Sequence, residues 1–300
     1  MKSHRSGSQT LVSLQIIVRL SLVALNVGLL LTGVEAKPRM LWKINADGTG
    51  LKQFAGGPET RCGSPDWSPD GKYIAFDTWQ DKAPNSSPAV QIGVVRADGT
   101  DLRLLGHGAM PSWSPDGKQI VCHTYDNPNT CVVMNADGSG RETILNHWGS
   151  PRWSPRGNRI ASILNGNIAL YDLATAKERV ILPGAYSVHY GFAISPDGAR
   201  FCFGGRSGDL YLATLDEQKM TAAVQPIMQS GMSHHASFAP DGKRIAFGWE
   251  PKEAKFSQLY ILDVDAKAST VQIKGQDTTH HNCDPDWSPD GKTIVFSSEP

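Results

Sequence analysis

Residues 67–76 read WSPDGKYIAF, and this phrase decides the fold because the chain carries six versions of it. In each version a tight turn comes first and an apolar run follows. A phrase that recurs at a period of about 20 to 50 residues indicates an array of like structural units. The six versions begin at Trp67, Trp113, Trp153, Ile194, Phe238 and Trp287.

The residues of the phrase predict a turn followed by a strand. Proline presets φ in Ser-Pro-Asp-Gly, and glycine adopts the positive φ that closes the turn. The apolar runs, such as residues 118–122 and 292–296, are rich in β-branched and aromatic residues, which is typical of half-buried strands. Asp-Gly turns at Asp47, Asp98 and Asp137 favour a second hairpin in the early units. Each unit therefore predicts four strands.

The spacing and the chain ends together predict a closed ring. Successive versions start 40 to 49 residues apart, which suits one four-stranded propeller blade. Residues 41–54 read as an outer hairpin without an inner one, and residues 286–298 as an inner hairpin without an outer one. Their pairing completes a blade and leaves no open edge. We expect an all-β, six-bladed propeller over residues 37–300, whereas an open stack of hairpins would leave two half-blades unpaired.

The first 36 residues predict an export signal. Arg5 and Arg19 precede an apolar run over residues 21–34 that is short for a membrane span, and Ala36 is a small residue suited to cleavage. We expect a periplasmic or secreted protein cut after Ala36, with an uncleaved anchor as the alternative. The formal net charge of zero does not indicate a nucleic-acid partner, and we expect a monomer with no membrane span after cleavage.

The repeat resembles the TolB-type propeller repeat, also called PD40 or WD40-like. The phrase at Trp67 and the turn within residues 134–138 carry this resemblance, which extends over essentially all of residues 37–300. It implies a TolB-like propeller. TolB itself has an α/β domain before its propeller, and we expect none here because the repeats begin soon after the predicted cleavage site. The Gly-x-Ser-x-Gly motif of hydrolases does not occur in the sequence.

The five cysteines leave two disulfides open as hypotheses. Cys62 and Cys283 precede the inner strands of blades that become neighbours on closure, and a bond there would staple the ring. Cys122 and Cys131 end and begin successive strands of one blade. Buried free thiols are the alternative for all four, and Cys202 reads as a core residue.

Histidines cluster in the segments that lead into the inner strands. His107, His147 and His281 each lie six residues before the tryptophan of their phrase, and Arg61 holds that place in the first unit. The segments lie on the ring face opposite the Ser-Pro-Asp-Gly turns, so the sequence predicts a crown of imidazoles at one channel mouth. The histidines are His107, His147, His189, His234, His235, His280 and His281.

One interpretation of this ring of histidines is a binding site for a metal or another ligand. Neutral imidazole binds Zn, Mn and similar divalent transition metals and also acts as a general base. The predicted metal ligands are His147, His189, His235 and His281. The alternative is that the repeat copies a polar residue that only packs and hydrogen-bonds at a wet channel mouth.

The stretch HHASFAPD at residues 234–241 resembles the His-x-x-Phe-Ser-Pro segment of oligogalacturonate lyases. That resemblance implies a His-rich Mn-type site and β-elimination of uronate sugars, with Arg61 and Arg206 suited to acidic substrates. Those lyases have seven blades, whereas this sequence predicts six.

The leading prediction is a binding module, with the metal-dependent lyase as the alternative. We expect the channel mouth to receive a small ligand, a glycan or a protein partner. Aromatic, acidic and amide side chains in nearby loops suit sugars or peptides. The predicted ligand-binding residues are Arg61, His107, His123, Arg206 and Trp249.

Overall fold

The structure is a computed structural model of the 300-residue chain, and it describes residues 38–56, 60–80, 90–184, 186–188, 191–265 and 269–300. The predicted export signal, residues 1–36, lies outside this range. Among the described residues, no helix is long and apolar enough to cross a membrane.

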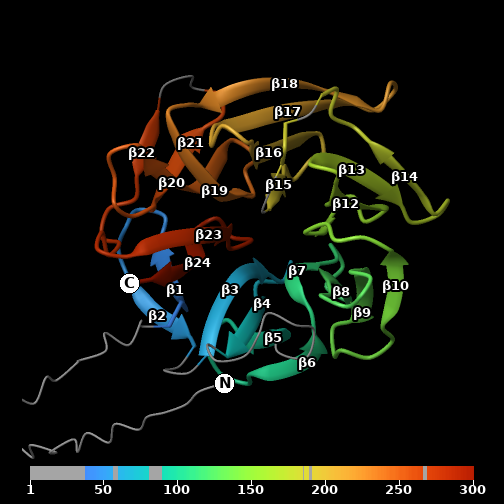
Figure 1. Cartoon of the computed structure of the whole chain (residues 1–300). Coiled ribbons are helices and arrows are strands. Elements are labelled where there is room, and N and C mark those ends of the chain that lie inside the picture. Colours follow the sequence, from blue (N-terminus) through green and yellow to red (C-terminus); the bar gives the residue numbers. More distant parts are fainter. Residues whose placement is uncertain (1–37, 57–59, 81–89, 185, 189–190, 266–268) are drawn as a thin grey trace, which may run out of the picture. The chain divides into compact units, whose positions relative to one another are not determined.

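Six antiparallel sheets of four strands form a ring, which confirms the six-bladed propeller (Figure 1). The first blade contains β3 (Thr60–Trp67), β4 (Tyr73–Gln80), β5 (Val90–Arg96) and β6 (Arg103–His107). The second contains β7 (Ala109–Trp113), β8 (Gln119–His123), β9 (Cys131–Asn135) and β10 (Glu142–Leu145). The third contains β11 (Arg152–Trp153), β12 (Arg159–Leu164), β13 (Asn167–Asp172) and β14 (Lys177–Val180).

The remaining blades complete the ring. The fourth contains β15 (Phe192–Ile194), β16 (Arg200–Gly204), β17 (Leu210–Asp216) and β18 (Thr221–Met228). The fifth contains β19 (Gly231–Phe238), β20 (Arg244–Pro251), β21 (Gln258–Asp263) and β22 (Thr270–Gln272). The sixth contains β23 (His281–Trp287), β24 (Thr293–Glu299), β1 (Met40–Asn45) and β2 (Lys52–Ala55).

The sixth blade closes the ring as the sequence predicts. Strand β1 pairs antiparallel with β24 from Met40 opposite Ser298 to Asn45 opposite Thr293, so the two chain ends share one sheet. The first strand of every blade lies innermost, and neighbouring innermost strands contact one another around the axis. This pairing removes the free sheet edges that would otherwise be left at the two half-blades.

The Ser-Pro-Asp-Gly turns are held by their own side chains. In the first blade the Ser68 hydroxyl donates to Asp70 at 2.7 Å and accepts from the Tyr73 amide at 2.9 Å. Gly71 has a φ of 69° and donates its N–H to the Ser68 carbonyl. Serine and aspartate therefore stabilise the turn, and glycine supplies the positive φ.

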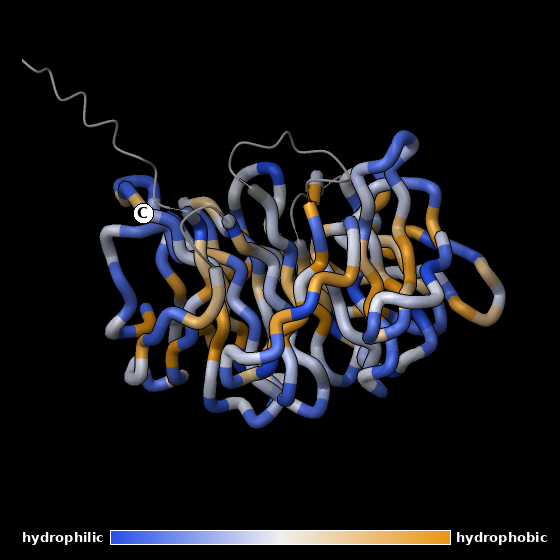
Figure 2. Tube along the Cα trace, turned by 90° about the horizontal axis from the view of Figure 1, so that it is seen from below, coloured by the Kyte–Doolittle hydropathy of each residue, from blue (hydrophilic) through white to orange (hydrophobic). Residues whose placement is uncertain are grey.

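The apolar core lies between the blades. Buried hydrophobic residues form six clusters, and each cluster joins two neighbouring blades. In the side view, apolar residues occupy the middle of the propeller and hydrophilic residues its two faces (Figure 2). The aromatic residue of the phrase packs in these joints; Trp153, for example, contacts residues of the second blade. The phrase thus forms the turn of its own blade and also packs that blade against the preceding one.

All five cysteines are buried free thiols, so the two disulfides considered from the sequence are not formed. The Cys62 thiol lies 3.9 Å from the Thr78 hydroxyl, and the Cys283 thiol lies 3.1 Å from the Ser257 hydroxyl. Burial raises the pKa of both thiols to about 12. The ring is closed by β1–β24 hydrogen bonds and packing rather than by a covalent staple.

Ile44→Ala tests the closure. Ile44 lies on β1, is fully buried and packs in the cluster between the fifth and sixth blades. We expect the substitution to lower the free energy of unfolding by about 2–5 kcal/mol because it leaves a cavity. Denaturant unfolding measures this. Val271→Ala, at a side chain that is 59% exposed on β22, is the control and should change the free energy by less than about 0.5 kcal/mol. Equal effects of the two variants would contradict the closure.

Candidate functional site: the central channel

We call the propeller face at the Ser-Pro turns the turn face, and the opposite face, where the chain enters the innermost strands, the linker face. The innermost strands run from the linker face to the turn face. Each carries a backbone irregularity three residues before its phrase, with φ between 41° and 63° in five of the six blades. The residues with this conformation are Ser64, Met110, Ser150, Gly191 and Asp284.

This irregularity turns side chains toward the channel. In four blades the register between the first and second strands shifts at this point, as between Gly63 and Asp66. A β-bulge bends a strand and re-aims its side chains. In four blades the residue with positive φ is followed by a proline, and a proline has no N–H to leave unpaired. These prolines are Pro65, Pro111, Pro151 and Pro285.

The residue immediately before each phrase forms a ring that we call the acceptor belt. Its members are Asp66, Ser112, Arg152, Ala193, Ser237 and Asp286. In four of the six joints, the belt side chain accepts the backbone N–H of the next blade's tryptophan. Trp113 donates to Asp66 at 2.7 Å, and Trp67 donates to Asp286 at 2.7 Å.

The two serine joints follow the same pattern. Trp153 donates its N–H to Ser112 at 3.2 Å, and Trp287 donates to Ser237 at 3.2 Å. Such bonds satisfy backbone donors that face the channel, where no further strand pairs with them. The belt therefore joins neighbouring blades at the axis, in addition to the apolar clusters.

Three charged side chains of the belt meet in the channel. Arg152 pairs with Asp66 at 2.9 Å, and Asp286 accepts from the Ser237 hydroxyl at 2.8 Å. Burial and the nearby Asp286 charge raise the pKa of Asp66 to about 7, although Arg152 opposes this rise. Burial also raises the pKa of Asp286 to about 6. The two carboxyl groups therefore titrate near neutral pH.

A cavity of about 150 Å³ lies at this level of the channel. It extends to Pro155 in the Ser-Pro turn of the third blade, so it lies toward the turn face. Its volume corresponds to about five water molecules. The cavity is lined by Asp66, Ser112, Arg152, Trp153, Pro155, Phe192, Ala193, Ile194, Ala236, Ser237, Phe238 and Asp286.

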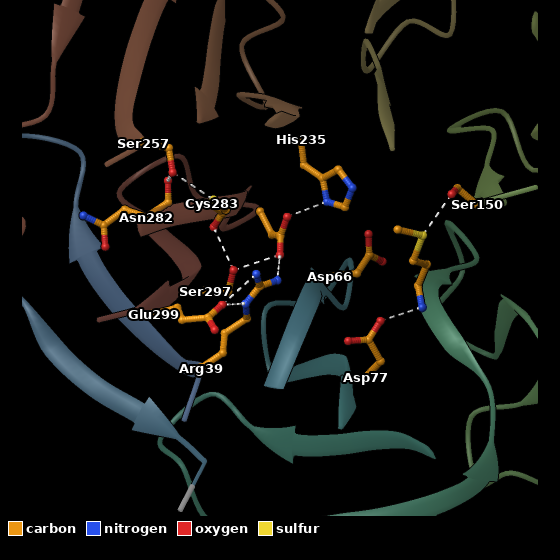
Figure 3. A network of polar contacts seen from close by, with 12 residues as sticks. Arg39, Asp66, Asp77, Ser150, His235, Ser257, Asn282, Cys283, Ser297 and Glu299 are labelled. Atoms are coloured by element: carbon orange, nitrogen blue, oxygen red, sulfur yellow. Dashed lines mark hydrogen bonds and ion pairs between the residues drawn. The ribbon is translucent and has the colours of Figure 1, made fainter. Parts of the chain in front are cut away.

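A second polar layer centres on Asp284, which precedes the phrase by three residues and contacts His235, Ser297 and Arg39. Figure 3 labels these three neighbours. His235 Nδ1 lies 2.7 Å from Asp284 Oδ1, and the Ser297 hydroxyl donates to Asp284 Oδ2 at 2.8 Å. Burial alone would raise the pKa of Asp284, but the His235 ring and the Arg39 guanidinium hold it well below its ordinary value. Only glycine fits at position 191, since a Cβ there would lie 2.3 Å from His235 Cδ2.

Two arginines and one glutamate continue this layer to the channel mouth. Arg39 Nη2 lies 2.9 Å from Glu299, and Arg61 also pairs with Glu299. Arg39 comes just before β1, Arg61 lies on β3 and Glu299 ends β24, so the group bridges the first and sixth blades. Their side chains are 25–30% exposed, which leaves them partly open to solvent at the linker face.

The structure directs the predicted metal ligands to different partners. His147 Nε2 lies 3.1 Å from both carboxylate oxygens of Glu178 on β14, the outermost strand of its blade. His281 packs on Phe256, with ring centroids 5.1 Å apart, and its Nδ1 accepts the Ser257 N–H. Of the histidines predicted as metal ligands, His235 lies in the channel network (Figure 3).

The predicted four-histidine site is therefore not assembled from the described part of the chain. His189 lies outside the described residues. Within the described ranges, no group of three or more His, Cys, Asp or Glu side chains is placed to hold a metal ion. Metal binding by these histidines, and the lyase activity that depends on it, remain predictions.

The predicted ligand-binding residues are also dispersed. His107 lies 3.4 Å from Asp126, and Arg206 donates to the Ser187 hydroxyl at 3.1 Å. Both lie at exposed or half-exposed positions on the linker face. Arg61 belongs to the Glu299 group described above.

His123 and Trp249 are core residues. His123 has no exposed surface, and within the described part of the chain neither ring nitrogen has a hydrogen-bond partner. Burial lowers the pKa of His123 to about 4, so its ring is neutral at physiological pH. Trp249 is 4% exposed and packs between the fourth and fifth blades. Neither ring offers a surface to a ligand.

The sequence prediction missed the residues that line the channel, because it compared the residues six positions before each phrase and not those directly before it. Counting back six residues finds the histidines, whereas counting back one finds the belt, including Asp66, Arg152 and Asp286. The available signal was the recurrence of charged residues immediately before the phrase, near the end of an innermost strand. Acidic and basic side chains are rarely buried without a partner, so their recurrence there marks the axis.

The comparisons with known proteins agree with the propeller fold. No family model matches the chain, and no curated protein matches it in sequence. Among solved structures, TolB from Acinetobacter baumannii superposes with a TM-score of 0.62 at 17% identity over 87% of this chain. A putative TolB from Agrobacterium tumefaciens superposes with a TM-score of 0.65 at 17% identity, over 88% of this chain and 98% of that one. The chain has a TolB-like propeller fold.

The TolB-like fold is shared more widely than the TolB proteins. A chain of a nidogen/laminin complex superposes with a TM-score of 0.57 at 11% identity, over 77% of this chain and 92% of that chain. This chain spans 64% of the length of the Acinetobacter TolB. At these identities the likeness concerns the fold.

Asp66→Asn tests the titration of the channel carboxyls. An aspartate whose folded pKa is about 7, against about 3.9 unfolded, holds a proton in the native state that the unfolded chain has released. Wild-type stability therefore falls as pH rises from about 4 to about 7. Because asparagine does not ionise, the Tm of the variant relative to wild type should rise by at least about 2 °C between pH 5 and pH 8.

Differential scanning calorimetry at the two pH values measures this shift. Asp98→Asn is the matched control, since the Thr100 hydroxyl and amide lower the pKa of this exposed turn carboxylate. Its relative Tm should not change between pH 5 and pH 8. A pH-independent Tm difference for Asp66→Asn would contradict titration of the channel pair.

Proposed function

We propose that the protein is an exported binding module that docks a protein partner on the linker face of the propeller. The observation that carries the proposal is the Arg39–Glu299–Arg61 group at the channel mouth, which three strand termini hold in place. Partly exposed ion pairs on a rigid scaffold offer charged groups in fixed positions at little entropic cost to binding.

Exposed apolar side chains on the same face as this charged group suit a protein interface. Met232 is the second residue of β19 and is 51% exposed, and Tyr125 follows β8 and is 38% exposed. Both lie at the linker end of their strands. Methionine, tyrosine and arginine are enriched at protein interfaces relative to the rest of the surface. The TolB-like fold, shared with a chain from a nidogen/laminin complex, is consistent with a binding role.

Site-directed photo-crosslinking tests the docking face. A photoreactive amino acid at Met232, on the linker face, should give a discrete crosslinked protein band in cells. The same amino acid at Lys72, in an exposed turn on the opposite face, is the control and should give none. In the Met232 protein, Arg61→Ala should weaken the band at least about threefold. Crosslinks from Lys72 alone would overturn the assignment, and a polydisperse glycan adduct at Met232 would assign a glycan in place of a protein.

Export is tested by the mass of the mature protein. We expect the full chain, expressed in a Gram-negative host, to appear outside the cytoplasm with an intact mass that lacks residues 1–36. Ala36→Asp should block cleavage, because the signal peptidase requires a small residue at that position. Recovery of the full-length mass from the cytoplasmic fraction would contradict export.

A further inference from the structure

Two of the six joints of the acceptor belt lack an acceptor. The belt residues that precede Ile194 and Phe238 around the ring are Arg152 and Ala193. A guanidinium only donates hydrogen bonds, and an alanine side chain does neither. At two adjacent joints, therefore, no belt side chain accepts the N–H of the next blade. At the other four joints the acceptors are Asp66, Ser112, Ser237 and Asp286.

The backbone N–H groups at these joints point toward the channel. In an antiparallel pair, residues that exchange backbone hydrogen bonds alternate with residues that do not. Ser195 donates to the Arg200 carbonyl, so Ile194 occupies a non-bonded position opposite Phe201. Ala239 likewise donates to Arg244, which leaves Phe238 non-bonded opposite Ile245. Both N–H groups therefore face away from their own blade, as the N–H of Trp67 does.

The cavity described above lies at these two joints. Arg152, Ala193, Ile194 and Phe238 all line it. Arg152 uses one of its N–H donors for Asp66, and its other donors have no acceptor among the described residues. Phe238 is buried and Ile194 is half-buried, and backbone donors in such positions rarely lack a partner. The two joints without an acceptor thus place several unpaired donors around this one cavity.

The lining is divided by chemistry. Arg152 and the two backbone N–H groups supply donors, whereas Phe192, Ala193 and Ala236 supply an apolar wall. We propose that this cavity binds the carboxylate of a short-chain organic acid, which replaces the missing belt acceptors. Its oxygens accept from the Ile194 and Phe238 N–H groups and pair with Arg152, and its alkyl part lies against the apolar wall.

Two acidic side chains of the lining oppose an anion. Asp66 and Asp286 are the acidic groups among the lining residues, and Arg152 is the basic one. Asp66 is already paired with Arg152, and Asp286 accepts from Trp67 and Ser237. The raised pKa of both carboxyls means that protonation reduces the negative charge near neutral pH. The site therefore resembles the aspartate joints of the same belt, where a carboxylate already accepts a tryptophan N–H.

Calorimetric titration of the full chain with sodium acetate and sodium propionate at constant ionic strength tests the proposal. We expect one saturable site with a dissociation constant of about 1 mM or tighter, and a matching rise in Tm. Acetamide has the size of acetate but no charge, and it should bind at least about tenfold more weakly. Octanoate exceeds the cavity and should not bind at this site.

Substitution of Ala193 provides the sharpest variants. Ala193→Asp and Ala193→Asn each introduce a side-chain acceptor for the Phe238 N–H, like the acceptors that Asp66 and Asp286 provide at other joints. Both should weaken acetate binding at least about tenfold and keep or raise the Tm. The neutral Asn separates replacement of the acceptor from charge repulsion. Ala97→Asp adds the same charge at an Asp-Gly turn away from the channel and should leave acetate binding unchanged. Arg152→Gln, which retains a donor toward Asp66, should also weaken binding.

Three results would overturn the proposal. One is the absence of a saturable response of wild type to acetate beyond that given by chloride. Another is wild-type acetate affinity in both Ala193 variants. The third is tighter binding of triglycine than of acetate, which would assign a chain terminus rather than a free short acid. The Met232 crosslinks report on the other face, so this proposal and the docking proposal fail independently.

Discussion

The innermost strand of each blade has no strand beyond it, so its channel-side backbone donors need partners of another kind. In four of the six joints of this propeller, the side chain just before the phrase on the preceding blade supplies the acceptor. Asp66 accepts the Trp113 N–H and Asp286 accepts the Trp67 N–H. The same aromatic residues pack in the apolar clusters between blades. One residue of the phrase therefore joins two blades by a hydrogen bond and by packing at once.

This constraint explains the charge distribution of the channel. Carboxylates are strong acceptors, but they bring negative charge to the channel axis, where burial disfavours it. Arg152 neutralises part of it, and burial raises the pKa of both Asp66 and Asp286. The Arg152 position then supplies no acceptor to its own neighbour. The missing acceptor at the Ile194 joint and the compensation of charge are thus two consequences of one residue, whereas the missing acceptor at the Phe238 joint follows from Ala193.

Sequence reasoning succeeded where the chemistry is local. Ser68, Asp70 and Gly71 form their turn through contacts within a few residues, and the repeat period follows from the length of four strands. The shared blade at the chain ends also followed from counting hairpins. Sequence reasoning failed for His123 and Trp249, which were read as loop residues but end up in the core. A position at the end of a strand does not tell whether its side chain turns to a neighbouring blade or to solvent.

The predicted ring of histidines also shows that sequence position does not fix the direction of a side chain. His147 and His281 share a spacing from their tryptophans. His147 bonds Glu178 on the outermost strand of its own blade, whereas His281 packs on Phe256 of the preceding blade. Equal spacing places backbones in equivalent positions and leaves side-chain direction to the local partners. The six repeats alone determine the number of blades and the turns, because these depend on contacts close in sequence. The repeats also determine the closure, because each chain end supplies one hairpin of a blade that the other end completes. The acceptor belt, the Asp66–Arg152–Asp286 group and the cavity were decided by tertiary structure, because they join residues from different blades that meet at the axis only once the ring is closed.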